Sequence, residues 1–158
     1  MTENKFRKRI RLEGYDYSTP GAYFVTICTL NRENILWDEV GADIVRLDSL
    51  PLSYAGKLVE KAVLQMPDYY NNISVDKYVI MPDHVHLLVT ITGSDSRVVS
   101  APTTLSKAVG SMKRWVSKQF GRSIWQKSFF EHSIRNQHDY DDVYTYIENN
   151  PLKYSLPD

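Results

Sequence analysis

The segment from His84 to Thr92 alternates between an apolar and a polar face, and this alternation constrains the fold more than any other feature of the chain. Successive side chains of a strand point to opposite faces, so one face carries Val85, Leu87, Val89 and Ile91. The other face carries His84, His86, Leu88 and Thr90. Pro82-Asp83 predicts a turn between this strand and an earlier strand over 73–81. The sequence therefore predicts a hairpin with its apolar face under helices and its histidines on the opposite face.

The elements predicted around the hairpin give the order strand, helix, strand, strand, helix, strand. They are a strand over 23–29, a helix over 52–65 closed by Pro67, a helix over 104–120 stopped by Gly121, and a strand over 124–134. A last helix is capped by Asp139 and runs to about Asn150, before Pro151. This order predicts an α+β fold, a ferredoxin-like βαββαβ antiparallel sheet with an extra C-terminal helix that carries Tyr146. The two crossover helices are expected to cover one sheet face and leave the other open.

The length of 158 residues fits one domain. Residues 1–19 are polar, with five basic residues between Lys5 and Arg11, and predict a basic N-terminal arm before a single domain over 20–158. Lys plus Arg and Asp plus Glu both number 19, and this zero net charge excludes a uniformly basic nucleic-acid coat protein. The single cysteine, Cys28, excludes an internal disulfide framework. No apolar run exceeds four residues, whereas a membrane span needs about 20, so we expect a cytoplasmic protein without a membrane segment.

The two histidines of the hairpin are candidate metal ligands. Alternate residues of a strand lie about 6–7 Å apart, and this separation suits two imidazole nitrogens that converge on one divalent ion. Two polar residues on the wet face of a strand are the alternative. The pattern by itself leaves both open.

The last predicted helix carries Tyr146 and Asn150 one turn apart, at the border of an apolar stripe formed by Tyr140, Val143 and Ile147. Docking of the stripe would direct the phenol and the carboxamide into the protein, whereas a tyrosine at a helix rim is the alternative. A phenol, with a pKa of about 10, attacks at neutral pH only where the electrophile is polarised or the proton is removed. A divalent ion held by two imidazoles and an amide oxygen could polarise a phosphodiester in this way.

Residues 96–130 contain seven basic residues and no acidic residue. The complete lack of carboxylates favours a phosphate-binding track, and a solvated helix face is the alternative. The candidate DNA-binding residues are Lys107, Lys113, Arg114 and Lys118 on the helix, together with Arg9 and Arg11 in the arm.

Three segments resemble the single-tyrosine HUH transposases, which are bacterial single-strand DNA transposases of insertion sequences, and in particular their REP-associated tyrosine transposase branch. The segments are YVIMPDHVHLLVTI (78–91), WQKSFFEHSIR (125–135) and YIENNPLKY (146–154). The opening RIRLEGYDYSTPGAYFVTICTLNRE (9–33) is also similar to that branch. The resemblance thus covers about residues 9–154, and its pairing of a Pro-x-His-hydrophobic-His unit with a tyrosine helix ending in Asn-Pro is specific.

The resemblance implies that His84 and His86 bind the metal, that Tyr146 is the nucleophile, and that Asn150 completes the metal site. It also implies a divalent metal cofactor, Mg²⁺ or Mn²⁺, and single-stranded DNA with a hairpin as the partner. Cleavage would leave a 5′-phosphotyrosine intermediate. His132 and Arg135 lie in a similar His-x-x-Arg segment and are expected near the site or on the DNA.

The leading hypothesis from the sequence is therefore a metal-dependent DNA nickase and strand-transferase. One alternative is a domesticated hairpin-DNA-binding protein that no longer cleaves. Another is a ferredoxin-like RNA binder, which would need exposed aromatic residues on the open sheet face. A homodimer is left open, and with it whether Tyr146 acts in its own chain's site or in that of a partner.

Overall fold

The computed structural model describes residues 21–38, 50–92 and 105–155, with side chains through residue 151. Within these residues, four strands form one antiparallel sheet in the order β2-β3-β1-β4. The strands are β1 (Gly21–Cys28), β2 (Ile73–Ile80), β3 (His84–Ile91) and β4 (Phe130–Ser133). The helices are the short 3-10 helix η1 (Leu30–Arg32), α1 (Tyr54–Tyr69), α2 (Leu105–Phe120) and α3 (Gln137–Ser155). The predicted α+β fold and its order of elements are confirmed.

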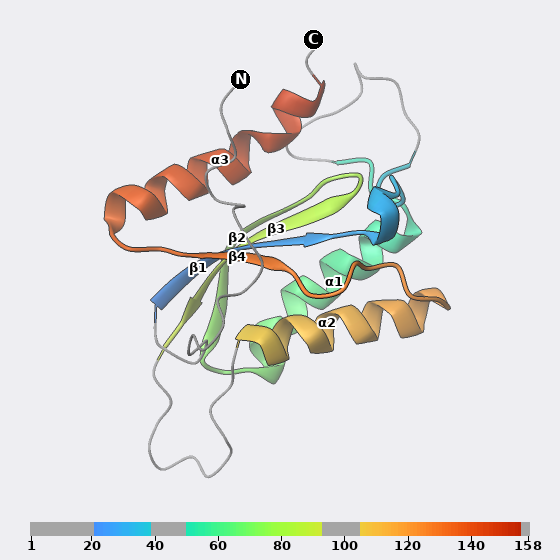
Figure 1. Cartoon of the computed structure of the whole chain (residues 1–158), viewed down its shortest axis with the longest axis horizontal. Helices are drawn as coiled ribbons and strands as arrows, with labels where there is room; N and C mark the ends of the chain where they lie inside the picture. The colour runs from blue at the N-terminus through green and yellow to red at the C-terminus, as the bar shows by residue number, and fades with distance from the viewer. Residues whose placement is uncertain (1–20, 39–49, 93–104, 156–158) are drawn as a thin grey trace.

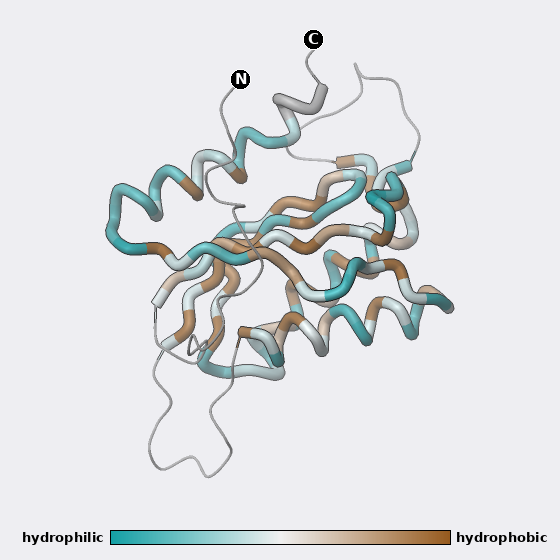
Figure 2. Tube along the Cα trace, in the orientation of Figure 1, coloured by the Kyte–Doolittle hydropathy of each residue, from teal (hydrophilic) through white to brown (hydrophobic). Residues whose placement is uncertain are grey.

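The sheet lies between two layers of helices, with α1 and α2 on one face and α3 across the other (Figure 1). The predicted apolar face of β3 packs beneath α1 and α2, against a core that includes Val59, Val63, Val109 and Val116. Hydrophobic residues follow the strands in the middle of the molecule, whereas much of α3 is hydrophilic (Figure 2). The alternation read from the sequence therefore assigns the two faces of β3 correctly.

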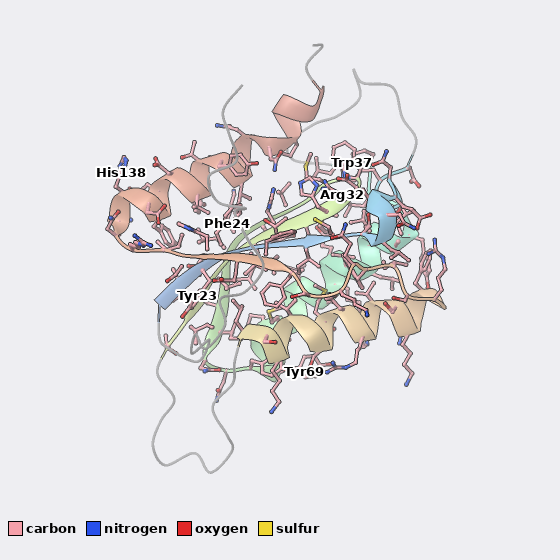
Figure 3. The ribbon with its side chains drawn as sticks, viewed as in Figure 1. Tyr23, Phe24, Arg32, Trp37, Tyr69 and His138 are labelled. Carbon is pink, nitrogen blue, oxygen red and sulfur yellow. The ribbon has the colours of Figure 1, made fainter. Side chains whose placement is uncertain are left out.

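The second face of the sheet is not open, contrary to the expectation from the sequence. Val143 and Ile147 of α3 are fully buried against this face, in a cluster with Phe24, Leu88 and Met81. Phe24 lies toward α3, while its neighbour Tyr23 lies toward α2 (Figure 3). The docking stripe predicted on the last helix is confirmed, and this stripe covers the face on which an RNA binder would stack bases.

Two prolines lie inside helices, although the sequence predicts that each helix ends before its proline. Pro67 lies within α1, and Pro151 lies within α3. A proline removes one helical hydrogen bond, and burial of neighbouring side chains compensates for that loss near a helix end. Met66 is 3% exposed, and Pro151 is itself buried. The predicted ends at residues 65 and 150 are therefore wrong by about one turn.

The strand predicted over 124–134 is confined to β4. Ser128 has a φ of 62°, which interrupts the extended backbone. The Lys113 ammonium of α2 donates to the carbonyls of Gln126 (2.8 Å) and Ser128 (2.7 Å). These two carbonyls are therefore bonded to a side chain and not to a neighbouring strand. In the segment before β4, Trp125 forms an isolated bridge with Thr29, the residue that follows β1.

The start of α3 also differs from the prediction. Asn136 Oδ1 accepts a hydrogen bond from the Asp139 backbone N–H (2.8 Å), so Asn136 caps the helix in place of Asp139. The Asp139 carboxylate instead accepts from His132 Nε2 (2.9 Å) and from the backbone N–H of Arg135 (3.3 Å). The Tyr140 hydroxyl donates to Asp76 Oδ2 of β2 (2.7 Å) and ties the first turns of α3 to the sheet.

Candidate active site

Two histidine rings project from β3 toward α3, as the alternation predicts. The ring centroids of His84 and His86 lie 4.6 Å apart, with the ring planes 67° from parallel. His86 is 1% exposed, and His84 is partly buried at the end of the strand. The pair therefore lies under the last helix and not on a wet surface.

Tyr146 of α3 reaches the same place. Its ring centroid lies 5.5 Å from that of His86 and 5.9 Å from that of Phe24 on β1. The adjacent Ile147 is fully buried and fixes the rotation of the helix about its axis. Tyr144 is instead 37% exposed, with the Lys77 ammonium 4.9 Å from its ring. Of these two tyrosines, the structure brings Tyr146 to the histidines.

Hydrogen bonds hold both imidazoles through Nδ1. Thr26 Oγ1 lies 3.0 Å from His86 Nδ1, because β1 and β3 pair with Thr26 opposite His86. Asp83 Oδ1 lies 2.7 Å from His84 Nδ1. Since both Nδ1 atoms are engaged, a metal ion would bind to these rings through Nε2.

The carboxylate of Asp83 also accepts from the Arg32 guanidinium. Asp83 Oδ2 lies 3.0 Å from Arg32 Nε and 2.9 Å from Arg32 Nη2. Partial burial raises the pKa of Asp83, but hydrogen bonds and charges from His84 and Arg32 outweigh burial and bring this pKa below its usual value. Asp83 is therefore ionised at neutral pH. Arg32 and Trp37 both lie in the segment that follows β1, at this end of the sheet (Figure 3).

Asn150 lies one helical turn beyond Tyr146 on α3, and its Nδ2 is buried without a hydrogen-bond partner. Burial of an unpaired amide group costs about 1–3 kcal/mol, and such an orphan calls for a ligand or water as its explanation. The nitrogen and oxygen of an amide exchange positions by a flip, so the side chain can present either atom. Two imidazoles and an amide oxygen would be a mixed donor set suited to Mn²⁺ and, with added water oxygens, to Mg²⁺. The described residues contain no cluster of three His, Cys, Asp or Glu residues that could hold a metal.

The predicted DNA-binding residues of α2 lie away from the histidines. Lys107, Arg114 and Lys118 are exposed on α2, which lies on the opposite face of the sheet. The Lys113 ammonium is bonded to the backbone before β4, as described above. Arg9 and Arg11, with the rest of the predicted arm, lie outside the described residues.

His132 and Arg135 lie at the junction of β4 and α3. His132 pairs with Phe24 in the register of β4 and β1, so it shares the sheet face of the metal-ligand candidates. Its contact with Asp139 fastens β4 to the first turn of α3. Arg135 is exposed.

The sequence interpretation missed four residues around the site, Phe24, Thr26, Arg32 and Asp83. The position of Asp83 directly before His84 indicates a possible contact with that ring, but in the sequence analysis Asp83 is interpreted only as a turn residue. Phe24 and Thr26 are identified only by the register of β1 against β3. No local pattern marks Arg32.

The model of the family described as "Transposase IS200 like" matches residues 21–150. An uncharacterized protein of Haemophilus influenzae is 28% identical over an alignment of 165 positions, and the alignment covers 92% of this chain and 88% of that protein. A REP-associated tyrosine transposase of Escherichia coli is 32% identical over 87 residues, about half of each protein (51% of this chain, 45% of the relative). A solved structure of a REP-associated tyrosine transposase bound to a REP hairpin superposes with a TM-score of 0.65 at 21% identity, covering 93% of this chain and 74% of that chain. This last likeness shows the fold.

Proposed function

The chain belongs to the IS200-like transposase family, and from that premise we propose that it is a metal-dependent enzyme that nicks and rejoins single-stranded hairpin DNA through a tyrosine nucleophile. Family membership supports a transposase-like, DNA-processing function. The observation that carries the finer proposal is the ring cluster of His84, His86 and Tyr146. Two imidazoles and a phenol from elements far apart in the sequence lie together, and one turn beyond the phenol lies a buried amide nitrogen without a hydrogen-bond partner.

Tyr146 would attack the phosphorus of a phosphodiester. A bond forms between phosphorus and the phenolic oxygen, and the bond between phosphorus and the 3′-oxygen breaks. The phenol loses its proton, and the departing 3′-oxygen takes one up. The products are a 5′-phosphotyrosine and a free 3′-hydroxyl. A 3′-hydroxyl can reverse the step without ATP, because the new ester between phosphorus and tyrosine conserves the energy of the broken phosphodiester bond.

His84 and His86 would hold Mg²⁺ or Mn²⁺ through ring nitrogens, and Asn150 would hold it through its amide oxygen. When bound, the ion would polarise the phosphodiester and stabilise the charge on the departing oxygen. Phe24 and the buried residues of α3 exclude water from one side of Tyr146. The chain itself thus orients the nucleophile and the ligands before the DNA binds.

We propose that the DNA partner is a hairpin, since the structural neighbour with the same fold is bound to one. The residues proposed to contact phosphates are Arg9, Arg11, Lys107, Arg114, Lys118 and Arg135. Lys113 would contribute chiefly by holding the segment before β4, and His132 by holding the junction of β4 and α3. Contacts of this kind are sensitive to salt, because each one releases counterions from the DNA.

A covalent-trapping experiment tests the proposal. The protein is incubated with hairpin-bearing single strands and Mn²⁺, and DNA attached to protein is measured after denaturation in SDS. We expect an adduct with the wild type, none above background with Tyr146→Phe, and an undiminished adduct with the matched variant Tyr144→Phe. Equal adduct from Tyr146→Phe would refute the nucleophile assignment. Hairpin binding by the wild type with no adduct under any divalent metal would instead support the non-cleaving alternative.

A further inference from the structure

We propose that Asp83 and Arg32 are positioning residues for the metal site, in which Asp83 fixes the imidazole of His84 and Arg32 acts through Asp83. The inference rests on the proposed function, because it takes His84 as a metal ligand. The pair touches neither Tyr146 nor Asn150 in any described contact, and it lies on a different segment from both.

The two oxygens of the Asp83 carboxylate have separate partners. Oδ1 accepts from His84 Nδ1 at 2.7 Å, and Oδ2 accepts from the Arg32 guanidinium at 2.9 and 3.0 Å. A carboxylate can only accept hydrogen bonds, so the proton of neutral His84 lies on Nδ1 and the lone pair lies on Nε2. A carboxylate in this position sets the tautomer and the ring orientation of a metal-binding histidine, and it raises the basicity of the ligand.

The backbone holds the two segments together. The Asp83 carbonyl accepts from both the backbone N–H (3.0 Å) and the hydroxyl (3.1 Å) of Thr29. The Pro82 carbonyl accepts from the Leu36 N–H (3.0 Å). The turn that carries Asp83 is therefore fastened to the residues on both sides of Arg32, and the guanidinium is kept within reach of the carboxylate.

The backbone conformation of Arg32 is unfavourable for arginine, which indicates that the position requires the guanidinium group. Asn31 and Arg32 have φ values of 55° and 54°, in the left-handed region. Asparagine tolerates this region and glycine adopts it without strain, whereas arginine rarely does. Strained residues of this kind gather at functional sites. The Arg32 side chain is 42% exposed, and an exposed ion pair adds little stability, so stability does not account for an arginine here.

Metal binding without DNA tests the inference. Mn²⁺ affinity is measured by calorimetry, and the tautomer of His84 is measured in the metal-free protein by ¹⁵N NMR. We expect Asp83→Ala to weaken Mn²⁺ binding about 10- to 100-fold and to move His84 toward the Nε2–H tautomer. Asp83→Asn retains an acceptor oxygen, so it should restore most of the tautomer and part of the affinity.

Arg32→Gly removes the guanidinium and leaves a residue suited to the left-handed backbone. We expect weaker Mn²⁺ binding in the wild-type background and no further loss in the Asp83→Ala background, because residues that act through one another are not additive. The matched control is Asn31→Gly, which makes the same backbone change at the neighbouring residue and should leave Mn²⁺ affinity unchanged.

The outcomes separate this inference from the proposed function. A wild type that does not bind Mn²⁺ contradicts the metal site itself. A wild type that binds Mn²⁺, with Asp83→Ala binding equally well and its His84 tautomer unchanged, overturns the role of Asp83 alone. A loss from Arg32→Gly that persists in the Asp83→Ala background overturns the indirect action of Arg32. If Asp83→Ala does not fold, the same readings are taken from Asp83→Asn and Arg32→Gly.

Discussion

The local environment of Asn150, one helical turn beyond Tyr146 on α3, favours function over stability. Its buried Nδ2 has no hydrogen-bond partner, and a group of this kind costs free energy in the folded state. Sites that bind ligands commonly retain such costs, because the missing partner is the ligand. The neighbouring Asn149 is exposed and provides a comparison of the same residue type on the same helix.

Substitution of Asn150 should therefore separate metal binding from stability. We expect Asn150→Ala to weaken Mn²⁺ binding about tenfold or more, as loss of one oxygen ligand would. The free energy of unfolding should change by no more than about 1 kcal/mol, since no hydrogen bond of Nδ2 is lost. Calorimetric Mn²⁺ titration and urea unfolding measure the two quantities. Asn149→Ala should change neither, and an Asn150→Ala protein with unaltered Mn²⁺ affinity would remove Asn150 from the ligand set.

At the level of secondary-structure elements, the position of α3 determines whether Tyr146 meets the histidines. Apolar burial of Val143 and Ile147 holds the middle of the helix. The hydroxyl of Tyr140 holds its first turns through Asp76, whose Oδ2 also accepts from Thr90 Oγ1 (2.6 Å). Burial, and then the hydrogen bond and charge of Asp76, raise the pKa of Tyr140 to about 12 from its ordinary 10.0.

This pKa gives the docking of α3 a dependence on alkaline pH. The folded-state pKa is raised, so the contribution of the Tyr140 hydroxyl is fully present below pH 10.0 and is lost as the pH rises toward about 12. We expect the free energy of unfolding, measured in urea, to fall across this window in the wild type. Tyr140→Phe should lose about 1 kcal/mol at neutral pH and should show a shallower alkaline fall.

The control for this experiment is Tyr69→Phe, because Tyr69 is 74% exposed. Its alkaline profile should match that of the wild type. Part of the fall should persist in Tyr140→Phe, since burial and Glu60 raise the pKa of Tyr78 to about 12 as well. An identical fall in the wild type and in Tyr140→Phe would show that the Tyr140 hydroxyl does not contribute to docking.

At the level of the whole molecule, the described fold places Tyr146 beside the histidines of its own chain. A second chain is therefore not needed to complete the cluster, although the sequence leaves a homodimer open. Residues 21–150 match the family as one unit, and a single domain over 20–158 after a basic arm over 1–19 stays a prediction. No helix among the described residues is long and apolar enough to cross a membrane.

Complementation tests whether the tyrosine acts within its own chain. His84→Ala retains the nucleophile and lacks a ligand, whereas Tyr146→Phe retains the ligands and lacks the nucleophile. We expect a mixture of the two proteins to form no more covalent DNA adduct than either alone, because each chain contains one defective site. Adduct that appears only in the mixture would show a tyrosine acting in a partner's site and would establish a functional dimer.

The sequence by itself determined the features that depend on local periodicity. The two faces of β3, the order of the elements and the docking stripe of α3 follow from the alternation of strands and the 3.6-residue period of helices. The candidates His84, His86, Tyr146 and Asn150 were identified in this way and by resemblance. Their roles stay proposals, although the fold brings the rings of the first three together.

Only the tertiary structure decided which segments meet. Strand register set Thr26 against His86, and the turn after β1 brought Arg32 to Asp83. The extension of α1 and α3 through their prolines, and the interruption before β4, depend on burial and on the contacts of Lys113. These features arise from interactions between residues distant in the sequence, and the energies of such contacts exceed the local preferences from which a sequence pattern is read.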